Sequence, residues 1–458
     1  MSLAGLFDTL AADGGIEATI SAARSGLAAY DLICPPAARP ALIATLVDAT
    51  DRIFLLVTST FREAELLTAA LQSLLTEDQV AYYPAWETLP HERLSPRSDT
   101  VGRRLAVLRR LQGRAESPAP RVVVAPVRSL LQPQVAGLAE LRPVTVTRGG
   151  EYPLDRLAAD LVAAAYQRVD LVERRGEFAM RGGIVDIFPP TAEHPVRVDL
   201  LGDDVEEITY FQVADQRSTE RTLATVTAGP CRELLITKRV RDRAAALTGD
   251  HPELAELLTR IAQGQATEGM EALIPALVDG LELLVDVLPA DALVLVNDPE
   301  LVHGRAEDLV RTSQEFLRAG WVAAAAGGRA PIDLGPSAYR RLGEVRRHAL
   351  ERGQGWWSLS SFASGPAPDR TEIDPRLAGV PSRILELQET PDWHGDIEAF
   401  LGQLHTDVTA GWQVLLSVEG AGQASRLAEL LGEHDLACRM TGELTGPPAG
   451  PVVQGFRS

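Results

Sequence analysis

Apolar and polar residues alternate most regularly at residues 172–190, where two apolar runs flank Gly182-Gly183. A Gly-Gly pair between alternating runs predicts a β-hairpin with a two-residue turn, because glycine adopts positive φ angles without a steric clash. The turn fixes a register that pairs Arg181 with Ile184, Met180 with Val185, Ala179 with Asp186, Phe178 with Ile187 and Glu177 with Phe188. Side chains alternate across a strand, so one face carries four apolar residues that we assign to the core: Phe178, Met180, Val185 and Ile187.

The opposite face of this hairpin mixes charged and apolar residues: Glu177, Ala179, Arg181, Ile184, Asp186 and Phe188. An exposed aromatic residue beside an arginine is typical of protein-binding surfaces, where these residue types contribute much of the binding energy. A second layer of structure that covers Phe188 and Ile184 would produce the same pattern. The pattern alone leaves both interpretations open.

Longer apolar runs predict a parallel α/β domain in two pieces. Residues 53–58 form a continuous apolar run, as expected for a parallel strand that is buried on both faces. A helical pattern and a second strand at residues 80–83 follow, which completes a βαβ unit. Residues 292–296 form another buried strand far along the chain. We therefore predict that residues 1–130 and 213–330 are the two halves of one discontinuous domain.

Three further regions complete the predicted organisation. Residues 131–212 contain the hairpin, one helix and two more strands, so we expect a small α+β domain inserted into the first domain. Residues 331–380 are rich in proline and glycine and are typical of a linker, in which Trp356-Trp357 would pack onto a neighbouring domain. Residues 381–458 repeat the strand–helix–strand order in a second small α/β domain. We expect that domain to be truncated, because it needs at least one more strand.

The composition is that of a globular chain with an acidic balance. With 458 residues the chain is too long for one hydrophobic core, and about three domains are expected. Its net charge of −19 argues against a free-standing DNA-binding protein but permits a protein partner with a basic surface. The three distant cysteines, Cys34, Cys231 and Cys438, indicate neither a disulfide framework nor a zinc site. Without a secretion signal or a membrane-spanning run, we expect a cytoplasmic protein that holds no metal.

The residues that would bind nucleotide in an α/β motor domain are missing. A phosphate-binding loop needs G-x-x-x-x-G-K-[ST], because its glycines admit the phosphates and its lysine contacts them. Residues 34–41 read CPPAARPA after the first strand, and the only lysine, Lys238, follows no such loop. The strand at 292–296 ends in Asn-Asp-Pro-Glu, where Asp298 is either a remnant of a Mg²⁺ ligand or a helix N-cap. We therefore expect no nucleotide cofactor and no enzymatic activity.

Residues 174–190 read RRGEFAMRGGIVDIFPP and are followed by VRVDLLGDDVEEITYFQVADQRS. This stretch closely resembles the bacterial transcription-repair coupling factor family (Mfd) and is similar to the equivalent domain of the excision-repair helicase UvrB. The resemblance implies a degenerate RecA/helicase-like fold whose inserted domain binds UvrA. It also implies that Arg168, Arg181 and Phe188 make that contact. From their position just before the hairpin, we expect Arg174 and Arg175 to extend the surface around Arg181. Ala179 stands where UvrB-type sequences have an arginine, which favours the coupling factor.

The resemblance also implies further partners, and two alternatives stay open. In the full-length family, RNA-polymerase-binding and ATP-driven DNA-translocating domains follow, and a later domain masks the UvrA-binding surface. One alternative is a UvrB-like, nucleotide-dependent helicase, which would turn over ATP. The other is a DNA-binding module that would bind a short duplex in a salt-dependent way through four arginines of one predicted helix: Arg103, Arg104, Arg109 and Arg110. A solvated helix face would explain the same arginines without a ligand.

Overall fold

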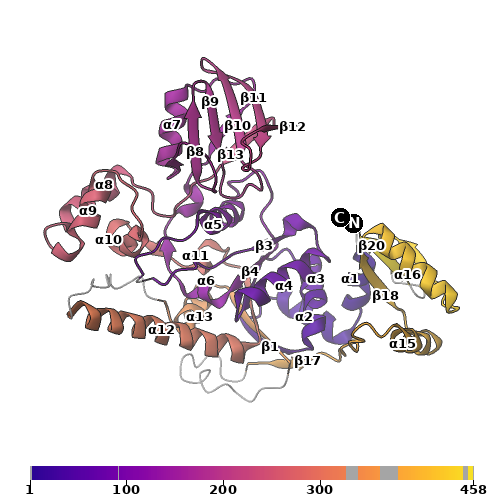
Figure 1. The fold of residues 1–458 in the computed structure, drawn as a ribbon. Coiled ribbons are helices and arrows are strands. Elements are labelled where there is room, and N and C mark those ends of the chain that lie inside the picture. The colour runs from indigo at the N-terminus through magenta and orange to yellow at the C-terminus, as the bar shows by residue number, and fades with distance from the viewer. Residues whose placement is uncertain (1–2, 91, 326–338, 362–379, 447–451, 457–458) are drawn as a thin grey trace.

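A computed structural model of the chain describes residues 3–90, 92–325, 339–361, 380–446 and 452–456. The prolines of the expected linker lie outside these residues. Figure 1 shows a central α/β domain, a second sheet that rises above it, a lobe of short helices at one side and a small sheet at the other. The chain enters the upper sheet from the central domain and returns to it afterwards.

The central sheet, within the described residues, has seven parallel strands in the order β17-β1-β16-β15-β2-β4-β3. Their bounds are β1 Ala29–Ile33, β2 Phe54–Thr58, β3 Val80–Tyr82, β4 Val122–Pro126, β15 Leu293–Asn297, β16 Gly355–Ser360 and β17 Ser382–Ile384. Every residue of β2, β4 and β15 is buried, as expected for strands covered on both faces. The predicted fold class, a discontinuous parallel α/β domain, is confirmed.

Helices cover both faces of the central sheet, and each face has its own apolar core. One face is covered by α2 Gly14–Arg24, α3 Arg39–Ala49 and α4 Phe61–Gln72. The other is covered by α5 Ser98–Leu111, α6 Val127–Leu131, α11 Leu284–Val287, α12 Pro299–Ala325 and α13 Leu342–Glu351. The Thr60 side chain accepts a hydrogen bond from Glu63 N and so caps α4, because the first N–H groups of a helix have no partner within it.

Residues 339–360 do not form a linker, and this part of the prediction is wrong. They form α13 and β16, and β16 lies between β1 and β15 in the middle of the central sheet. Trp357 is 0% exposed, and its indole Nε1 donates a hydrogen bond to Leu27 O at 2.8 Å. The two tryptophans belong to the core of the first domain and do not pack onto a neighbouring one.

The inserted domain is built on a six-stranded sheet in the order β12-β11-β10-β9-β8-β7. Its strands are β7 Gln167–Arg168, β8 Glu177–Arg181, β9 Ile184–Ile187, β10 Val196–Leu201, β11 Asp204–Phe211 and β12 Ser218–Thr222. The β8–β9 hairpin has the predicted register, from Arg181 opposite Ile184 to Phe178 opposite Ile187. Helix α7, Leu154–Ala163, packs on the face predicted as core. Because β12 and β13 Thr225–Ala228 follow residue 212, the domain extends further than predicted, and β13 pairs with β6 Val144–Thr147.

The hairpin packs against helix α5 of the central domain. Ser98 Oγ donates a hydrogen bond to Arg175 O at 2.8 Å, just before β8. A Cβ atom at Gly102 would lie 2.5 Å from Pro190 Cβ, just after β9, so only glycine allows this approach. Both ends of the hairpin therefore pack against the same helix of the central domain.

The remaining described elements form two peripheral units. A helical lobe contains α8 Lys238–Leu247, α9 Ala255–Ala262 and α10 Ile274–Leu277, packs against Trp86, and adjoins the short pair β5 Gln134–Val135 and β14 Leu281–Glu282. A three-stranded parallel sheet has the order β18-β20-β19, with β18 Leu415–Glu419, β19 Arg439–Thr441, β20 Val452–Phe456, α15 Ile397–Thr409 and α16 Ala421–Glu433. It meets α1 Ala4–Ala11, where Gly5 N donates to Leu444 O at 2.8 Å. Among the described helices, none is long and apolar enough to cross a bilayer.

Candidate partner-binding site

The free edge of the inserted sheet is formed by β7, which runs parallel to β8. Gln167 N donates to Gly176 O and Val169 N donates to Phe178 O, both at 2.9 Å. In a parallel pair, the residue between two such donors directs its own N–H and C=O away from the neighbour. Arg168 is that residue. It is exposed, and no hydrogen bond or ion pair to its guanidinium is found within the described chain.

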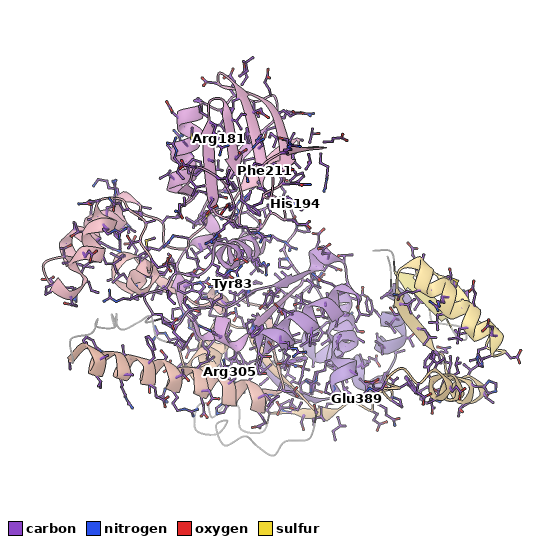
Figure 2. The ribbon with its side chains drawn as sticks, viewed as in Figure 1. Tyr83, Arg181, His194, Phe211, Arg305 and Glu389 are labelled. Atoms are coloured by element: carbon purple, nitrogen blue, oxygen red, sulfur yellow. The ribbon has the colours of Figure 1, made fainter. Side chains whose placement is uncertain are left out.

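Arg181 reaches the same edge from β8. Its side chain, labelled in Figure 2, is exposed. Arg181 Nη2 donates a hydrogen bond to Asp170 O at 2.5 Å, in the segment directly after β7. Arg168 is level with Phe178 and shares its face, whereas Arg181 lies on the face of Ala179. The two guanidinium groups therefore leave one edge of the sheet on opposite faces.

Phe188 is not an exposed aromatic residue, so of the two interpretations that the sequence left open the covered face is the one observed. Its role in partner binding stays a prediction. The Phe188 side chain is 7% exposed and packs in a small apolar cluster with Val172, Ala179 and Phe211. The Arg175 guanidinium lies 5.2 Å above its ring while Arg175 Nε donates to Ala192 O at 2.9 Å. A second layer of side chains thus covers this part of the sheet, as the alternative interpretation proposed. Phe188 can support the surface from below, and Arg175 is half-buried by the same contacts.

Leu171 is an apolar candidate for the surface that sequence reasoning missed. It is 40% exposed and follows Asp170, whose carbonyl oxygen holds Arg181. Arg174 is exposed in the same segment between β7 and β8. Leu171 lies outside both alternating runs of the hairpin, and its position there is all that the sequence offers to single it out. Of the five predicted contact residues, the structure leaves Arg168, Arg174 and Arg181 open to a partner.

Over the middle of the sheet, on the face of Ala179, Arg197 is paired and further carboxylates lie beside it. Arg197 makes two hydrogen bonds to the Asp186 carboxylate, at 2.7 and 2.9 Å, and its guanidinium lies over the Phe211 ring. Burial raises the pKa of the neighbouring Asp199 carboxyl. The positive charge of Arg197 acts in the opposite direction, and the negative charge of Glu207 raises the pKa further. Among the described residues, positive charge without a carboxylate partner therefore lies at the two edges of the sheet, beside β7 and beside β12, rather than over its middle.

The four arginines considered for DNA binding do not form a common surface. Arg104 is 0% exposed and pairs with Glu233 at 2.6 Å. Arg109 donates to Leu141 O at 2.5 Å, and Arg110 Nε donates to Pro118 O at 3.0 Å. Only Arg103 among the four is exposed without such an internal contact. Both alternatives for these arginines, a DNA surface formed by all four and a wholly solvated helix face, therefore fail at Arg104.

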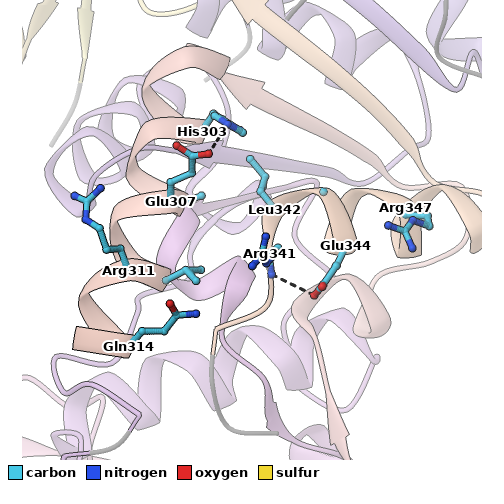
Figure 3. Close-up of a pocket in the computed structure, with 11 residues that line it drawn as sticks. His303, Glu307, Arg311, Gln314, Arg341, Leu342, Glu344 and Arg347 are labelled. Atoms are coloured by element: carbon cyan, nitrogen blue, oxygen red, sulfur yellow. Dashed lines mark hydrogen bonds and ion pairs between the residues drawn. The ribbon is translucent and has the colours of Figure 1, made fainter. Parts of the chain in front are cut away.

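A groove of about 490 Å³ lies between α12 and α13 (Figure 3). His303 pairs with Glu307 across 3.2 Å, and Arg341 N donates to Glu344 Oε2 at 3.3 Å. Among the described residues that line the groove, none has a hydroxyl or thiol side chain. Within the described residues, no cluster of side chains has the composition of a metal site. Neither observation gives this groove a catalytic arrangement.

Comparison with known proteins agrees with the geometry of the inserted domain. Residues 144–233 match the family model of the UvrB interaction domain. The chain is 44% identical over 448 residues to the transcription-repair-coupling factor of Mycobacterium tuberculosis (strain CDC 1551 / Oshkosh), which covers 93% of this chain and 35% of that protein. It is 30% identical over 298 residues to the transcription-repair-coupling factor of Bacillus subtilis (strain 168), covering 61% and 25%. For the protein of the same name from Escherichia coli (strain K12), the identity is 32% over 154 residues, covering 33% and 13%.

The chain thus spans about a third of the length of the curated relatives that it matches over nearly its whole extent. The predicted hairpin and the sheet that contains it fall inside the matched interaction domain. The chain corresponds to the N-terminal region of the bacterial transcription-repair coupling factor family and carries a UvrB interaction domain at residues 144–233.

Proposed function

We propose that this chain recruits UvrA to sites of stalled transcription and that the β7–β8 edge of the inserted sheet makes the contact. One observation carries the proposal: the interaction domain holds two exposed arginines, Arg168 and Arg181, at a free sheet edge. In this view the chain is a binding module of transcription-coupled nucleotide excision repair in the cytoplasm. It uses no cofactor and hydrolyses no nucleotide.

The chemistry of the edge fits an acidic partner surface. A guanidinium group binds a carboxylate through two parallel hydrogen bonds, which gives both strength and a defined orientation. Arg181 is already held by Asp170 O, so less side-chain entropy is lost when a partner binds it. Leu171 would fill a shallow apolar pocket, and Arg174 would extend the positive surface. Because Arg168 and Arg181 leave the edge on opposite faces, the partner must enclose the edge rather than lie on one face.

We propose that the other contacts of the full-length family use surfaces other than the β7–β8 edge. Contacts with RNA polymerase and double-stranded DNA, and an intramolecular contact that masks the β7–β8 edge, would involve regions beyond this chain. A UvrB-like, nucleotide-dependent helicase would require a phosphate-binding loop, and residues 34–41 lack both its glycines and its lysine. We expect no ATP turnover and no increase in melting temperature with ATP.

A titration of the chain with purified UvrA tests the proposal. Replacing both arginines, Arg168→Ala/Arg181→Ala, should weaken binding by about 2 kcal/mol or more, which is roughly 30-fold in Kd. The matched control is Arg217→Ala/Arg221→Ala, which removes two exposed arginines at the opposite edge of the same sheet, beside and within β12. Calorimetry should give the parent affinity for the control. Equal affinities of the first double variant and the parent would refute the assignment of the edge.

A further inference from the structure

The carboxyl ends of the central strands carry a buried arginine where a parallel α/β domain usually binds its ligand. In open parallel sheets, ligands bind in the crevice outside these strand ends. Here Arg39, the first residue of α3, is 1% exposed and reaches the ends of β15 and β16. It follows the short 3₁₀ turn Pro36–Ala38, in the place where a phosphate-binding loop would stand.

Four hydrogen bonds surround the Arg39 guanidinium. Nη1 donates to Asn297 Oδ1 and Asp298 Oδ2, both at 2.8 Å. Nη2 donates to Asp298 Oδ1 at 2.7 Å and to Ser361 Oγ at 2.8 Å. The Asp298 carboxylate thus receives the planar fork through both oxygens, the geometry in which an arginine–carboxylate pair is strongest. The acceptors lie at the ends of two neighbouring strands, so one side chain joins three segments of the fold.

The acceptor side of this site is held rigidly by further bonds. Asp298 adopts φ of +49°, a left-handed conformation that is uncommon for a residue other than glycine. Its amide donates to Leu359 O at 2.9 Å, at the end of β16. Asn297 Nδ2 donates to Glu63, whose other carboxylate oxygen accepts from Ser59 N at 3.0 Å. Strained backbone that neighbouring bonds maintain is typical of sites that bind a defined group.

Cys34 completes the surroundings of the guanidinium without adding charge. Its side chain is 1% exposed, and burial raises the pKa of the thiol even though the Arg39 guanidinium acts in the opposite direction. The thiol is therefore neutral at ordinary pH. Asp298 is the counter-ion that Arg39 contacts directly.

We propose that Asn297, Asp298 and Ser361 form a guanidinium-binding site that Arg39 occupies as an internal ligand, in place of an external ligand at the carboxyl edge of the sheet. The side chain cross-links α3 to the ends of β15 and β16. The domain thereby holds these strand ends together without nucleotide, beside a hollow of about 320 Å³ that Arg39 and Asp298 help to line. The inference concerns the central domain and does not depend on UvrA binding.

Chemical rescue of Arg39→Ala by methylguanidinium tests the site. The variant keeps the acceptors but loses the ligand, and its melting temperature should fall by roughly 5–10 °C because Asp298 is left without its counter-ion. Methylguanidinium at ten times its Kd should raise the melting temperature of the variant by about 3 °C. It should not stabilise the parent, in which Arg39 fills the site. Methylammonium and urea at the same concentrations should not rescue the variant.

The matched control is Arg39→Ala/Asp298→Asn, in which asparagine tolerates the left-handed backbone but carries no charge. Methylguanidinium should not stabilise this variant. Rescue of Arg39→Ala no greater than that by methylammonium, or equal rescue of the control, would overturn the proposal. If Arg39→Ala does not fold, a double-mutant cycle of Arg39→Lys and Asp298→Asn replaces it. If the two single substitutions together cost less stability than the sum of their separate costs, the residues interact and the site is supported. If the two costs simply add, the site is contradicted.

Discussion

The ion pair between Arg104 and Glu233 offers a sharp test of how the inserted domain is held. Both side chains are 0% exposed, and Arg104 Nε lies 2.6 Å from Glu233 Oε1. Arg104 also donates to Pro84 O at 2.9 Å and to Gln134 Oε1 at 3.1 Å. Glu233 accepts a second hydrogen bond from Trp86 Nε1 at 3.0 Å. The pair thus joins α5 to the segment through which the chain leaves the inserted domain.

The magnitude follows from the charge that each variant leaves behind. Arg104→Met fills a similar volume but leaves a buried carboxylate without its counter-ion, which costs about 3–5 kcal/mol. Arg104→Met/Glu233→Gln removes that charge and keeps an acceptor for the indole of Trp86. Because replacing a whole buried pair is often close to neutral, the double variant should be more stable than Arg104→Met by about 2 kcal/mol or more.

Hydrogen exchange of the α5 amides measures this effect locally, because a chain with several domains does not unfold in one step. A loss of about 3 kcal/mol should accelerate exchange roughly 100-fold or more in Arg104→Met. Lys238→Met is the control, since the Lys238–Asp242 pair is largely exposed and such pairs contribute about 0.5 kcal/mol. A double variant that is no more stable than Arg104→Met would refute the reasoning, because the cost would not come from the unpaired carboxylate.

Two further predictions concern packing and pH. Gly102→Ala should destabilise the junction by about 1–3 kcal/mol, because the new Cβ atom would clash with Pro190 even though alanine favours helices. Hydrogen exchange of the hairpin amides should therefore accelerate. In the control, Gly304→Ala, the new Cβ atom contacts nothing, so α12 should not be destabilised. Burial raises the pKa of the Tyr83 and Tyr166 phenols, so their contribution to stability is complete below pH of about 10 and is lost as pH rises further, by about 1.4 kcal/mol per pH unit and tyrosine. Urea unfolding above pH of about 10 should show stability falling with pH, to which the buried thiols of Cys34 and Cys231 add, and Tyr166→Phe should make the fall less steep. An unchanged slope in Tyr166→Phe would contradict the burial argument.

The sequence predicted the hairpin in detail because its information is local. The alternation from Phe178 to Ile187 and the two turn glycines specify the register without reference to the rest of the chain. The missing phosphate-binding loop is equally local, since residues 34–41 are contiguous. What such patterns cannot supply is burial of a side chain by distant residues. Phe188 has an alternating position that suits either an exposed or a covered face, and contacts with residues outside the two paired strands, such as Val172 and Phe211, cover it.

Long-range pairing explains the other differences. The strand β16 has a short Gly-Trp-Trp-Ser-Leu-Ser sequence in a region rich in breakers, and its neighbours β1 and β15 come from distant segments. Arg104 looks like any helix-surface arginine in the sequence, because its partner Glu233 is 129 residues away. The partner of Arg39 is 259 residues away. Composition identifies such charges, but it does not show which of them fold into the interior.

The buried and exposed arginines have complementary roles in the proposed function. Arg39 fixes the carboxyl edge of the central sheet, and Arg104 fixes α5, on which both ends of the hairpin rest. A rigid base limits the orientations in which Arg168 and Arg181 are displayed. A partner that encloses the β7–β8 edge then loses less conformational entropy on binding, because the surface is already ordered. On this reasoning, internal ion pairs keep the α/β domain in one conformation, and the exposed arginines use that conformation to bind.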